Sequence, residues 1–449
     1  MPVLSLETPL RTQSRRSSAP LPAVVGGDLR VPSRSGPVRY GNLDHAASTP
    51  ALVAVKDAVD TALQTYASVH RGAGWASRVT SAWYEQAREE VARFVGARSE
   101  DEVVFTRTTT DSWNLLAKAL PDGAVVFVFE SEHHSTLLPW PSTRTVRLPV
   151  PGSLEEATAL LEQALEAHPA PIRLVVLTAA SNVTGEVWPV DRFAALAHRH
   201  GARLAVDAAQ LAAHRPVDLA TWDADYVAFS GHKLYAPFGA GALVGRRDWL
   251  DAGTPYLAGG GATRAVTPSS TVWQTGPARH EGGSPNVIGA IALAAACATL
   301  SRHWDAIERH EARLLARLRR GLGDIPGVRQ LSALEDGRDR VGVVAFTVAG
   351  FDPSLVSQVL AWEQGLGVRD GKFCAHLLVD RLLAQGQPST TAVRASIGLG
   401  TTAEAVDRLL LGVRSLVEQG PVDDWSHDGS GWVRASADDR HLRSVPRPW

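Results

Sequence analysis

Two charged residues stand directly after apolar, strand-like stretches of the sequence, and their types suit covalent amine chemistry. Lys233, one of only four lysines, follows Tyr226–Ser230, and Asp207 follows Arg203–Val206. A lysine shielded from water has a lowered pKa and forms imines readily. A buried carboxylate needs a positive partner, which the protonated pyridine nitrogen of pyridoxal phosphate provides. Together the two residues indicate a pyridoxal phosphate enzyme. Taken alone, Lys233 is also typical of a surface loop, and Asp207 of a helix N-cap.

Hydroxyl-bearing residues mark a candidate anion site. The run from Thr108 to Ser112 lies between a predicted strand, Val103–Thr106, and a predicted helix, Ser112–Ala119. Amides and hydroxyls at a helix N-terminus bind phosphate, so this run fits the phosphate of the cofactor. An ordinary N-cap formed by Asp111 or Ser112 is the alternative.

Two adjacent histidines, His133 and His134, follow the predicted strand Ala124–Phe129. An imidazole at this place can stack over a planar cofactor. Adjacent histidines also suggest a metal ion, but no Cys or His at ligand spacing completes such a site. We therefore expect ring stacking and no metal centre.

Short apolar strands alternate with helices over most of the chain. This alternation is typical of an α/β protein with a mostly parallel sheet that helices cover on both faces. Ligands of such sheets bind at the carboxyl ends of the strands. The predicted elements are the helices Pro50–Ala67, Ser81–Val95, Leu154–His168 and Val190–His200 and the strand Arg173–Thr178, besides those named above. Five polar stretches lie where ligands are expected: Thr108–Asp111, Glu132–Ser135, Ser181–Gly185, Asp207–Gln210 and Ser230–Lys233.

The pattern divides the chain into four regions. Residues 1–37 are rich in Ser, Pro, Arg and Gly, which predicts a mostly disordered extension, with a transit peptide as the alternative. Residues 38–300 form the large α/β domain, and residues 301–420 a smaller α+β domain. The smaller domain contains the predicted elements Trp304–Leu322, Val341–Val348, Pro353–Gln364, Ala392–Ile397 and Ala403–Glu418. Residues 421–449 form a polar tail that is either loose or docked.

Composition excludes several classes of protein. The 449 residues carry a net charge of −2, which argues against nucleic-acid binding. No apolar run reaches the roughly 18 residues that span a bilayer, so we expect no membrane insertion. The two cysteines, Cys297 and Cys374, are too few for a disulfide framework. A cytoplasmic location is the simplest expectation.

The motifs together resemble a known family. The sequence is similar to fold-type I, class V pyridoxal phosphate enzymes, and within them most similar to group II cysteine desulfurases, also called selenocysteine lyases. The resemblance covers about residues 40–397. It rests on the stretches Leu43–Ala47, Val69–Gly72, Phe105–Asn114, Glu132–Trp140, Ala180–Gly185, Val206–Gln210, Ser230–Gly245, Glu281–Asn286, Arg369–Ala375 and Val393–Ser396.

The resemblance implies a role for each matching residue. Lys233 would hold the cofactor covalently, Asp207 would pair with its pyridine nitrogen, and His133 would stack on its ring. Gln210 would bind the phenolic oxygen. The implied phosphate ligands are Thr109, Thr110, Ser230 and His232, with Ser284 supplied by a second subunit. The implied substrate-binding residues are His70 near the entrance, Arg369, and the carboxylate ligands Asn182 and Arg394.

Cys374 decides which reaction the resemblance implies. Related desulfurases have a cysteine at this point of an Arg-x-Gly loop, where it takes the substrate sulfur as a persulfide. The alternative is a small buried side chain without a catalytic role. This sequence differs from that family at Lys372-Phe373, where two histidines are usual, at Thr108, where glycine is usual, and over His376–Leu383.

The first functional hypothesis is therefore a cysteine desulfurase that converts L-cysteine to L-alanine. The second is another class V reaction, by an aminotransferase, a C–S β-lyase or an amino-acid epimerase, with Cys374 not catalytic. A non-catalytic scaffold is disfavoured by the intact set Lys233, Asp207 and Arg394. The resemblance also implies a homodimer and leaves room for a sulfur-acceptor protein.

Overall fold

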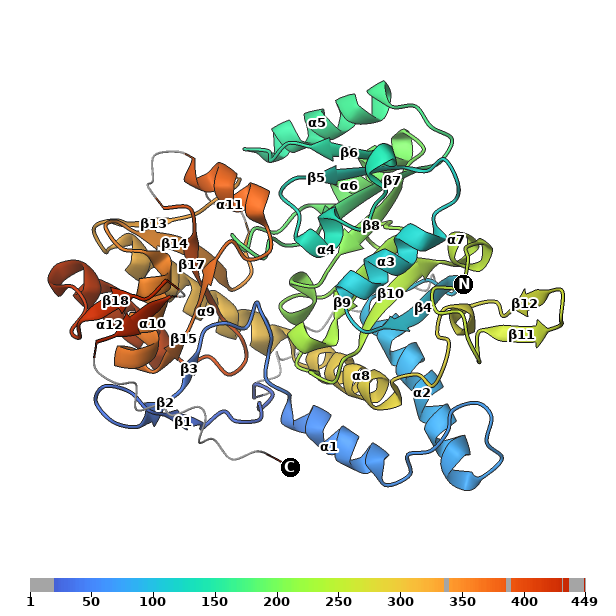
Figure 1. Ribbon diagram of the computed structural model, residues 1–449, viewed down its shortest axis with the longest axis horizontal. Helices are drawn as coiled ribbons and strands as arrows, with labels where there is room; N and C mark the ends of the chain where they lie inside the picture. Colours follow the sequence, from blue (N-terminus) through green and yellow to red (C-terminus); the bar gives the residue numbers. More distant parts are fainter. Residues whose placement is uncertain (1–19, 335–338, 385–388, 430, 436–447, 449) are drawn as a thin grey trace, which may run out of the picture.

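The computed structural model describes residues 20–334, 339–384, 389–429, 431–435 and 448. The elements gather in two lobes (Figure 1). The larger lobe contains a seven-stranded sheet between layers of helices, and the smaller lobe contains a four-stranded sheet with helices packed against it. The predicted α/β class with a mostly parallel seven-stranded sheet is confirmed.

One edge of the large sheet collects the ends of its parallel strands. The strands are β4 (Asp101–Thr106), β5 (Val125–Phe129), β6 (Thr145–Leu148), β7 (Arg173–Thr178), β8 (Arg203–Asp207), β9 (Tyr226–Ser230) and β10 (Gly241–Arg246). Their order is β4-β10-β9-β8-β7-β5-β6. Strand β10, which the sequence did not predict, runs antiparallel to both β9 and β4. All other strands therefore point the same way, and their carboxyl ends share one edge.

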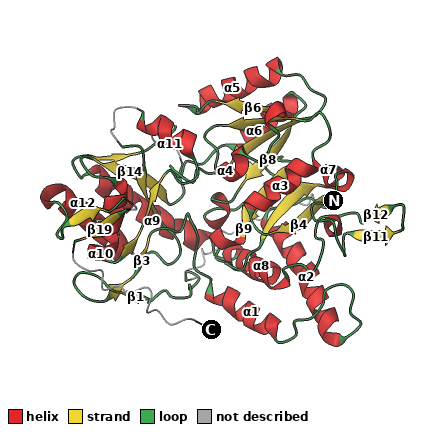
Figure 2. Cartoon of the chain, viewed as in Figure 1, coloured by secondary structure: helices red, strands yellow, loops and turns green. Residues whose placement is uncertain are grey.

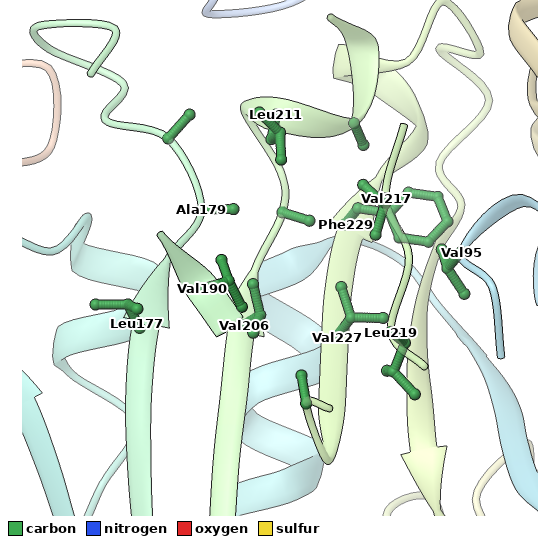
Figure 3. Close-up of a cluster of buried hydrophobic side chains, with 14 of the residues drawn as sticks. Val95, Leu177, Ala179, Val190, Val206, Leu211, Val217, Leu219, Val227 and Phe229 are labelled. Carbon is green, nitrogen blue, oxygen red and sulfur yellow. The ribbon is translucent and has the colours of Figure 1, made fainter. Parts of the chain in front are cut away.

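Both faces of this sheet are buried, which explains the continuous apolar runs of its strands. In β5, Phe127 and Phe129 pack into one core, whereas Val126 and Val128 pack into the core on the opposite face. Figure 3 shows part of the first core, which includes Val206 of β8, Phe229 of β9 and Leu211 from the turn after β8.

Helices cover both faces of the large sheet (Figure 2). They are α1 (Val53–Leu63), α2 (Trp75–Phe94), α3 (Thr109–Ala119), α4 (His134–Leu137), α5 (Leu154–Ala167), α6 (Val190–Arg199), α7 (Arg247–Ala252) and α8 (Val287–Ser301). A separate hairpin consists of β11 (Thr263–Val266) and β12 (Thr271–Trp273). The predicted helix Pro50–Ala67 is shorter in the structure because its first residues instead pair with Val24 and its neighbours. The predicted helix Ser81–Val95 is longer and begins at Trp75.

The smaller lobe has an antiparallel sheet in the order β13-β14-β17-β16. Its strands are β13 (Val328–Gln330), β14 (Val343–Val348), β16 (Arg369–Gly371) and β17 (Ala392–Ser396). Its helices are α9 (Trp304–Gly323), α10 (Pro353–Gln364), α11 (His376–Leu383) and α12 (Ala403–Gln419). A short parallel pair, β15 (Leu366–Gly367) with β3 (Gly41–Asn42), brings residues from near the start of the chain into the smaller lobe (Figure 1).

Helix α8 is apolar on all sides because it is buried in the core of the large lobe, with Ala292, Cys297 and Leu300 inaccessible. Among the described residues, no single helix is long and apolar enough to cross a bilayer. Helices α8 and α9 meet that test only as a pair bent by 78°.

The first described residues contact both lobes, since Val24 pairs with Leu52 and Arg34 bonds to Trp362, and the described part of the C-terminal tail packs on the smaller lobe. The prediction of a disordered extension was wrong for residues 20–37, since β1 (Arg30–Val31) pairs with β2 (Val38–Arg39). Residues 1–19 lie outside the described residues. In the C-terminal tail, β18 (Trp425–His427) pairs with β19 (Trp432–Arg434), and Asp423 accepts a hydrogen bond of 2.5 Å from Trp362 of α10. The described part of the tail is therefore docked.

Candidate active site

A pocket of about 300 Å³ lies at the carboxyl edge of the large sheet, facing the smaller lobe. It brings together 12 of the 14 residues that the sequence predicted for the site. These are Thr109, Thr110, His133, Asn182, Asp207, Gln210, Ser230, His232, Lys233, Arg369, Cys374 and Arg394. The prediction that strand ends would converge on one ligand site is thereby supported by the geometry.

Lys233 stands at the end of a short turn after β9 and is half-buried at the pocket floor. Burial lowers the pKa of Lys233 to about 8, against the opposing effect of the Asp207 carboxylate. Its amino group has no hydrogen bond or ion pair among the described residues. A lysine with a lowered pKa and a free amine is a nucleophile at neutral to mildly alkaline pH.

Asp207 ends β8 and is only 5% exposed. The Thr136 hydroxyl donates to its Oδ2 atom at 2.5 Å, and the Ala209 amide donates to Oδ1 at 2.9 Å. No buried cation pairs with it among the described residues, so the carboxylate remains available for a positive group of a ligand.

The N-terminus of α3 forms an anion cradle against β9. The Thr109 amide donates to Ser230 Oγ at 2.7 Å, and the Thr109 and Ser230 hydroxyls lie 2.8 Å apart. Thr108 caps the helix, since its side chain accepts from the Asp111 amide. Backbone amides and hydroxyls at a helix N-terminus suit a phosphate group.

His133 lines the pocket from the start of α4. Burial, with the nearby charge of Lys233, lowers the pKa of His133 to about 3. Its Nδ1 atom accepts from the Ser135 amide at 3.0 Å, which orients the ring. His133 is therefore a neutral, held imidazole at physiological pH, as ring stacking requires.

A buried guanidinium lies on the smaller-lobe side of the pocket. Arg394 of β17 is 2% exposed and donates to the Asn182 carbonyl at 3.0 Å and to Asp44 Oδ1 at 3.2 Å. Its Nε atom is buried without a hydrogen-bond partner among the described residues. Arg369, which is exposed, reaches the other oxygen of Asp44 at 3.3 Å. Two guanidiniums thus share one carboxylate, which leaves capacity for a substrate carboxylate.

Cys374 projects an exposed thiol at the mouth of the pocket. Phe373 and Cys374 both have left-handed backbones, with φ of 52° and 55°, which is unusual for consecutive residues other than glycine. Two hydrogen bonds hold this turn: the His134 amide donates to the Cys374 carbonyl at 2.7 Å, and Asn182 Nδ2 donates to the Phe373 carbonyl at 2.8 Å. The Phe373 ring lies 5.0 Å from the Arg394 guanidinium.

Two predicted site residues, His70 and Ser284, do not line this pocket. His70 is exposed, and its Nε2 atom lies 2.8 Å from Glu85 beside a second pocket of about 670 Å³. Ser284 is exposed between Gly283 and Pro285, which line the same second pocket. Within one chain His70 does not reach the entrance of the first pocket, and its place near the substrate entrance stays a prediction. The role given to Ser284 concerns a second subunit and stays a prediction.

Sequence reasoning assigned no role to three residues that support the site: Asp44, Thr136 and Glu132. Asp44 belongs to a stretch that carried the resemblance, but its pairing with Arg394 joins residues 350 positions apart. Glu132 is 1% exposed, and burial together with the Asp207 charge raises its pKa well above the usual value. For Glu132, the signal in the sequence was an acidic residue close to the end of a buried strand.

The residues present fit pyridoxal phosphate. The cradle of α3 suits its phosphate, Asp207 its pyridine nitrogen, and Lys233 its aldehyde. Gln210 Oε1 is buried, lacks a partner among the described residues, and belongs to a side chain that lines the pocket. A buried polar atom without a partner is costly, so a ligand with a polar ring substituent would satisfy it.

Comparison with known proteins agrees with this site. The aminotransferase class-V family matches residues 41–409. A cysteine desulfurase from Dickeya dadantii is 36% identical over 394 residues, which are 85% of this chain and 92% of that protein. A probable cysteine desulfurase from Mycolicibacterium paratuberculosis is 36% identical over 79% of this chain, which spans only 52% of that relative. The crystal structure of a cysteine desulfurase from Escherichia coli superimposes with a TM-score of 0.73 at 33% identity, covering 84% of this chain and 95% of that one.

Proposed function

Because the chain belongs to the aminotransferase class-V family, we propose that it is a pyridoxal phosphate-dependent cysteine desulfurase. The substrate is L-cysteine, the carbon product is L-alanine, and Cys374 receives the sulfur. The observation that carries this proposal is the exposed Cys374 thiol at the mouth of the pocket that holds Lys233.

The residues of the large lobe hold the cofactor. Thr109, Thr110, Ser230 and His232 bind the phosphate, with His133 against the ring and Gln210 at the ring oxygen. Asp207 keeps a proton on the pyridine nitrogen, and Thr136 orients the carboxylate. When bound, pyridoxal phosphate supplies an electron sink for negative charge at the substrate Cα atom.

The substrate carboxylate binds Arg394, whose planar guanidinium suits a bidentate contact. Asn182 positions that guanidinium through its carbonyl and the Cys374 turn through its amide. Lys233 then moves the proton at Cα, because an amine of pKa about 8 exchanges protons readily near neutral pH.

Cys374 attacks the substrate sulfur as a thiolate. The new bond joins the two sulfur atoms, the Cβ–S bond breaks, and its electron pair stays on carbon, which then takes a proton. L-cysteine and the Cys374 thiol thereby give L-alanine and a persulfide on Cys374, without an external oxidant. Burial lowers the pKa of both Lys233 and Arg394, and a Cys374 thiolate opposes that effect at each of them.

The deciding experiment measures alanine and sulfide release from L-cysteine with a thiol reductant. We expect activity in the wild type and in Cys297→Ala, whose thiol is buried in α8, and loss of activity in Cys374→Ala. Activity retained in Cys374→Ala would instead indicate a C–S β-lyase. No alanine from a protein that still binds the cofactor would overturn the assignment in favour of an aminotransferase or an epimerase.

We further propose a homodimer and transfer of the sulfur to an acceptor protein. The exposed positions of His70 and Ser284 around the second pocket support a contact with a second subunit. The exposure of Cys374 supports access by an acceptor. Light scattering after size-exclusion chromatography tests the first proposal, and a monomer at micromolar concentration would contradict it.

A further inference from the structure

A buried polar chain leads away from the pocket behind Gln210. Gln210 Nε2 lies 3.2 Å from His214 Nε2, and the opposite ring nitrogen, Nδ1, contacts Glu311 Oε2. The three residues are only 5%, 4% and 3% exposed, respectively. None of the functions assigned above uses His214 or Glu311, yet burying an imidazole and a carboxylate is costly unless they serve each other.

This chain of hydrogen-bonded side chains spans the two lobes. Gln210 and His214 flank the turn Leu211–Ala213 after β8, and Leu211 anchors this turn in the large core (Figure 3). Glu311 lies on α9, which runs between the lobes (Figure 1), with Ile307 in the core of the large lobe and Leu314 in that of the smaller lobe. Both ends of the chain are therefore attached to rigid elements.

The proton positions follow from the partners. Glu311 Oε1 accepts from Arg215 at 3.4 Å, and a carboxylate oxygen accepts hydrogen bonds and does not donate them. His214 Nδ1 therefore carries a proton and donates it to Glu311. The Gln210 amide nitrogen can only donate, so His214 Nε2 accepts from it.

This direction determines which end of the Gln210 amide meets a ligand. With Nε2 held by His214, one N–H and the unpartnered Oε1 atom remain for the pocket. If the chain ran the other way, His214 would donate to Oε1, and both hydrogens of the amide nitrogen would turn to the pocket. The other titratable groups around His214 are His45, His310, Tyr235 and Arg215.

We infer that the Glu311–His214 pair is a positioning device that fixes the direction of the Gln210 amide, and so tunes the protonation of the ring oxygen of the bound cofactor. This inference rests on the proposed function only as far as pyridoxal phosphate binding. His214 and Glu311 act through Gln210 and do not touch the ligand.

Glu311→Gln tests the inference because it reverses the direction of the hydrogen bonds from residue 311 to Gln210, with little change in the shape of the side chain. Arg215 faces Oε1 of residue 311, so a glutamine there presents its nitrogen to His214. His214 Nδ1 then accepts, Nε2 carries the proton, and the Gln210 amide turns. The readout is the pH midpoint of the visible absorption band of bound pyridoxal phosphate, together with the Kd of the cofactor. We expect a shift of roughly half to one pH unit, the size of one exchanged hydrogen bond.

Two controls separate positioning from a structural effect. In the background Gln210→Met, adding Glu311→Gln should move the midpoint no further, as a double-mutant cycle requires for coupled residues. Glu308→Gln, on the same helix, should leave the midpoint unchanged. If Glu311→Gln does not fold, His214→Asn interrupts the chain at its centre and should shift the midpoint in the wild-type background but not with Gln210→Met.

Three results would overturn the inference. One is an unchanged midpoint in a folded Glu311→Gln protein. Another is a shift that persists with Gln210→Met. The third is a wild-type protein with no visible band, which would overturn the proposed function as well. A normal band with no alanine release from L-cysteine would overturn only the proposed function.

Discussion

The floor and the mouth of the same pocket are built by opposite means. The floor consists of strand ends from one sheet, where Asp207, Ser230 and Thr109 are buried and hydrogen-bonded to each other or to neighbouring turns. The mouth consists of residues 369–376 from the smaller lobe, where Arg369 and Cys374 are exposed and two residues have left-handed backbones.

The difference between the two parts shows which groups must be held in fixed positions and which must stay accessible to solvent. A cofactor that stays bound requires groups whose positions the core holds, and burial there also shifts the pKa of Lys233 and His133. A thiol that must meet both substrate and acceptor has to remain in solvent. Two hydrogen bonds and the buried neighbours Phe373 and Ala375 hold the strained turn in place, while Cys374 itself stays exposed.

The largest effect should come from the floor. Lys233→Ala should lower kcat for alanine formation by about 10³-fold or more, because it removes both the covalent anchor and the proton carrier. Borohydride reduction should no longer fix the cofactor to the protein, as measured by mass spectrometry. Lys118→Ala, which removes an exposed lysine of α3, is the matched control. A Lys233→Ala rate within tenfold of wild type would contradict the expectation that the floor of the pocket contributes more to activity than its mouth.

The next prediction compares the two arginines that share Asp44. Arg394→Lys should raise KM for L-cysteine by about 10- to 100-fold, since it loses a buried, charge-assisted bidentate contact. Arg369→Lys changes an exposed side chain and should alter KM by about threefold or less. Steady-state kinetics of the two variants gives the answer. Equal effects would mean that the mouth recognises the substrate as strongly as the buried side of the pocket.

The burial of His45, beside the pocket floor, should also affect how the stability of the protein depends on pH. Burial lowers the pKa of His45 to about 4, below the ordinary value of 6.5. The unfolded chain then binds the proton more readily, so stability is lost as the pH falls below about 6.5. Between pH 6.5 and pH 5.0 the wild type should lose more free energy of unfolding than His45→Leu does. The difference between the two losses should be about 1.5 kcal/mol. Urea unfolding at the two pH values measures this difference, and equal losses would contradict the burial effect.

The smallest effect concerns strain at the mouth. Cys374→Gly should be at least as stable as Cys374→Ala, and up to about 1 kcal/mol more stable, because glycine adopts a positive φ without steric cost. Ala54→Gly, at an exposed position of α1, should cost about 1 kcal/mol as the matched control. Thermal unfolding of the three variants tests this. A Cys374→Gly protein less stable than Cys374→Ala would show that the turn is not strained.

Much of the frame was predictable from the sequence. The buried strands Arg173–Thr178 and Tyr226–Ser230 have the predicted bounds because a run of apolar residues between turn residues specifies a doubly covered strand. Strand β10 was missed because Gly241 and the short turn before it read as a glycine-rich loop. The ordered residues 20–37 were missed because their partners, such as Trp362 and Leu52, lie far along the chain or in another element.

The sequence by itself determined the chemical types of the site: a lysine, an aspartate and hydroxyls at strand ends, and a cysteine in a separate loop. Local patterns carry this information, since strand ends and helix N-termini depend on neighbouring residues. Only the tertiary structure decided that Cys374 opens onto the Lys233 pocket and that His70 does not. It also decided that Asp44 and Glu311 act on residues 350 and 97 positions away. Such pairings arise from the packing of two lobes, and no local pattern encodes them.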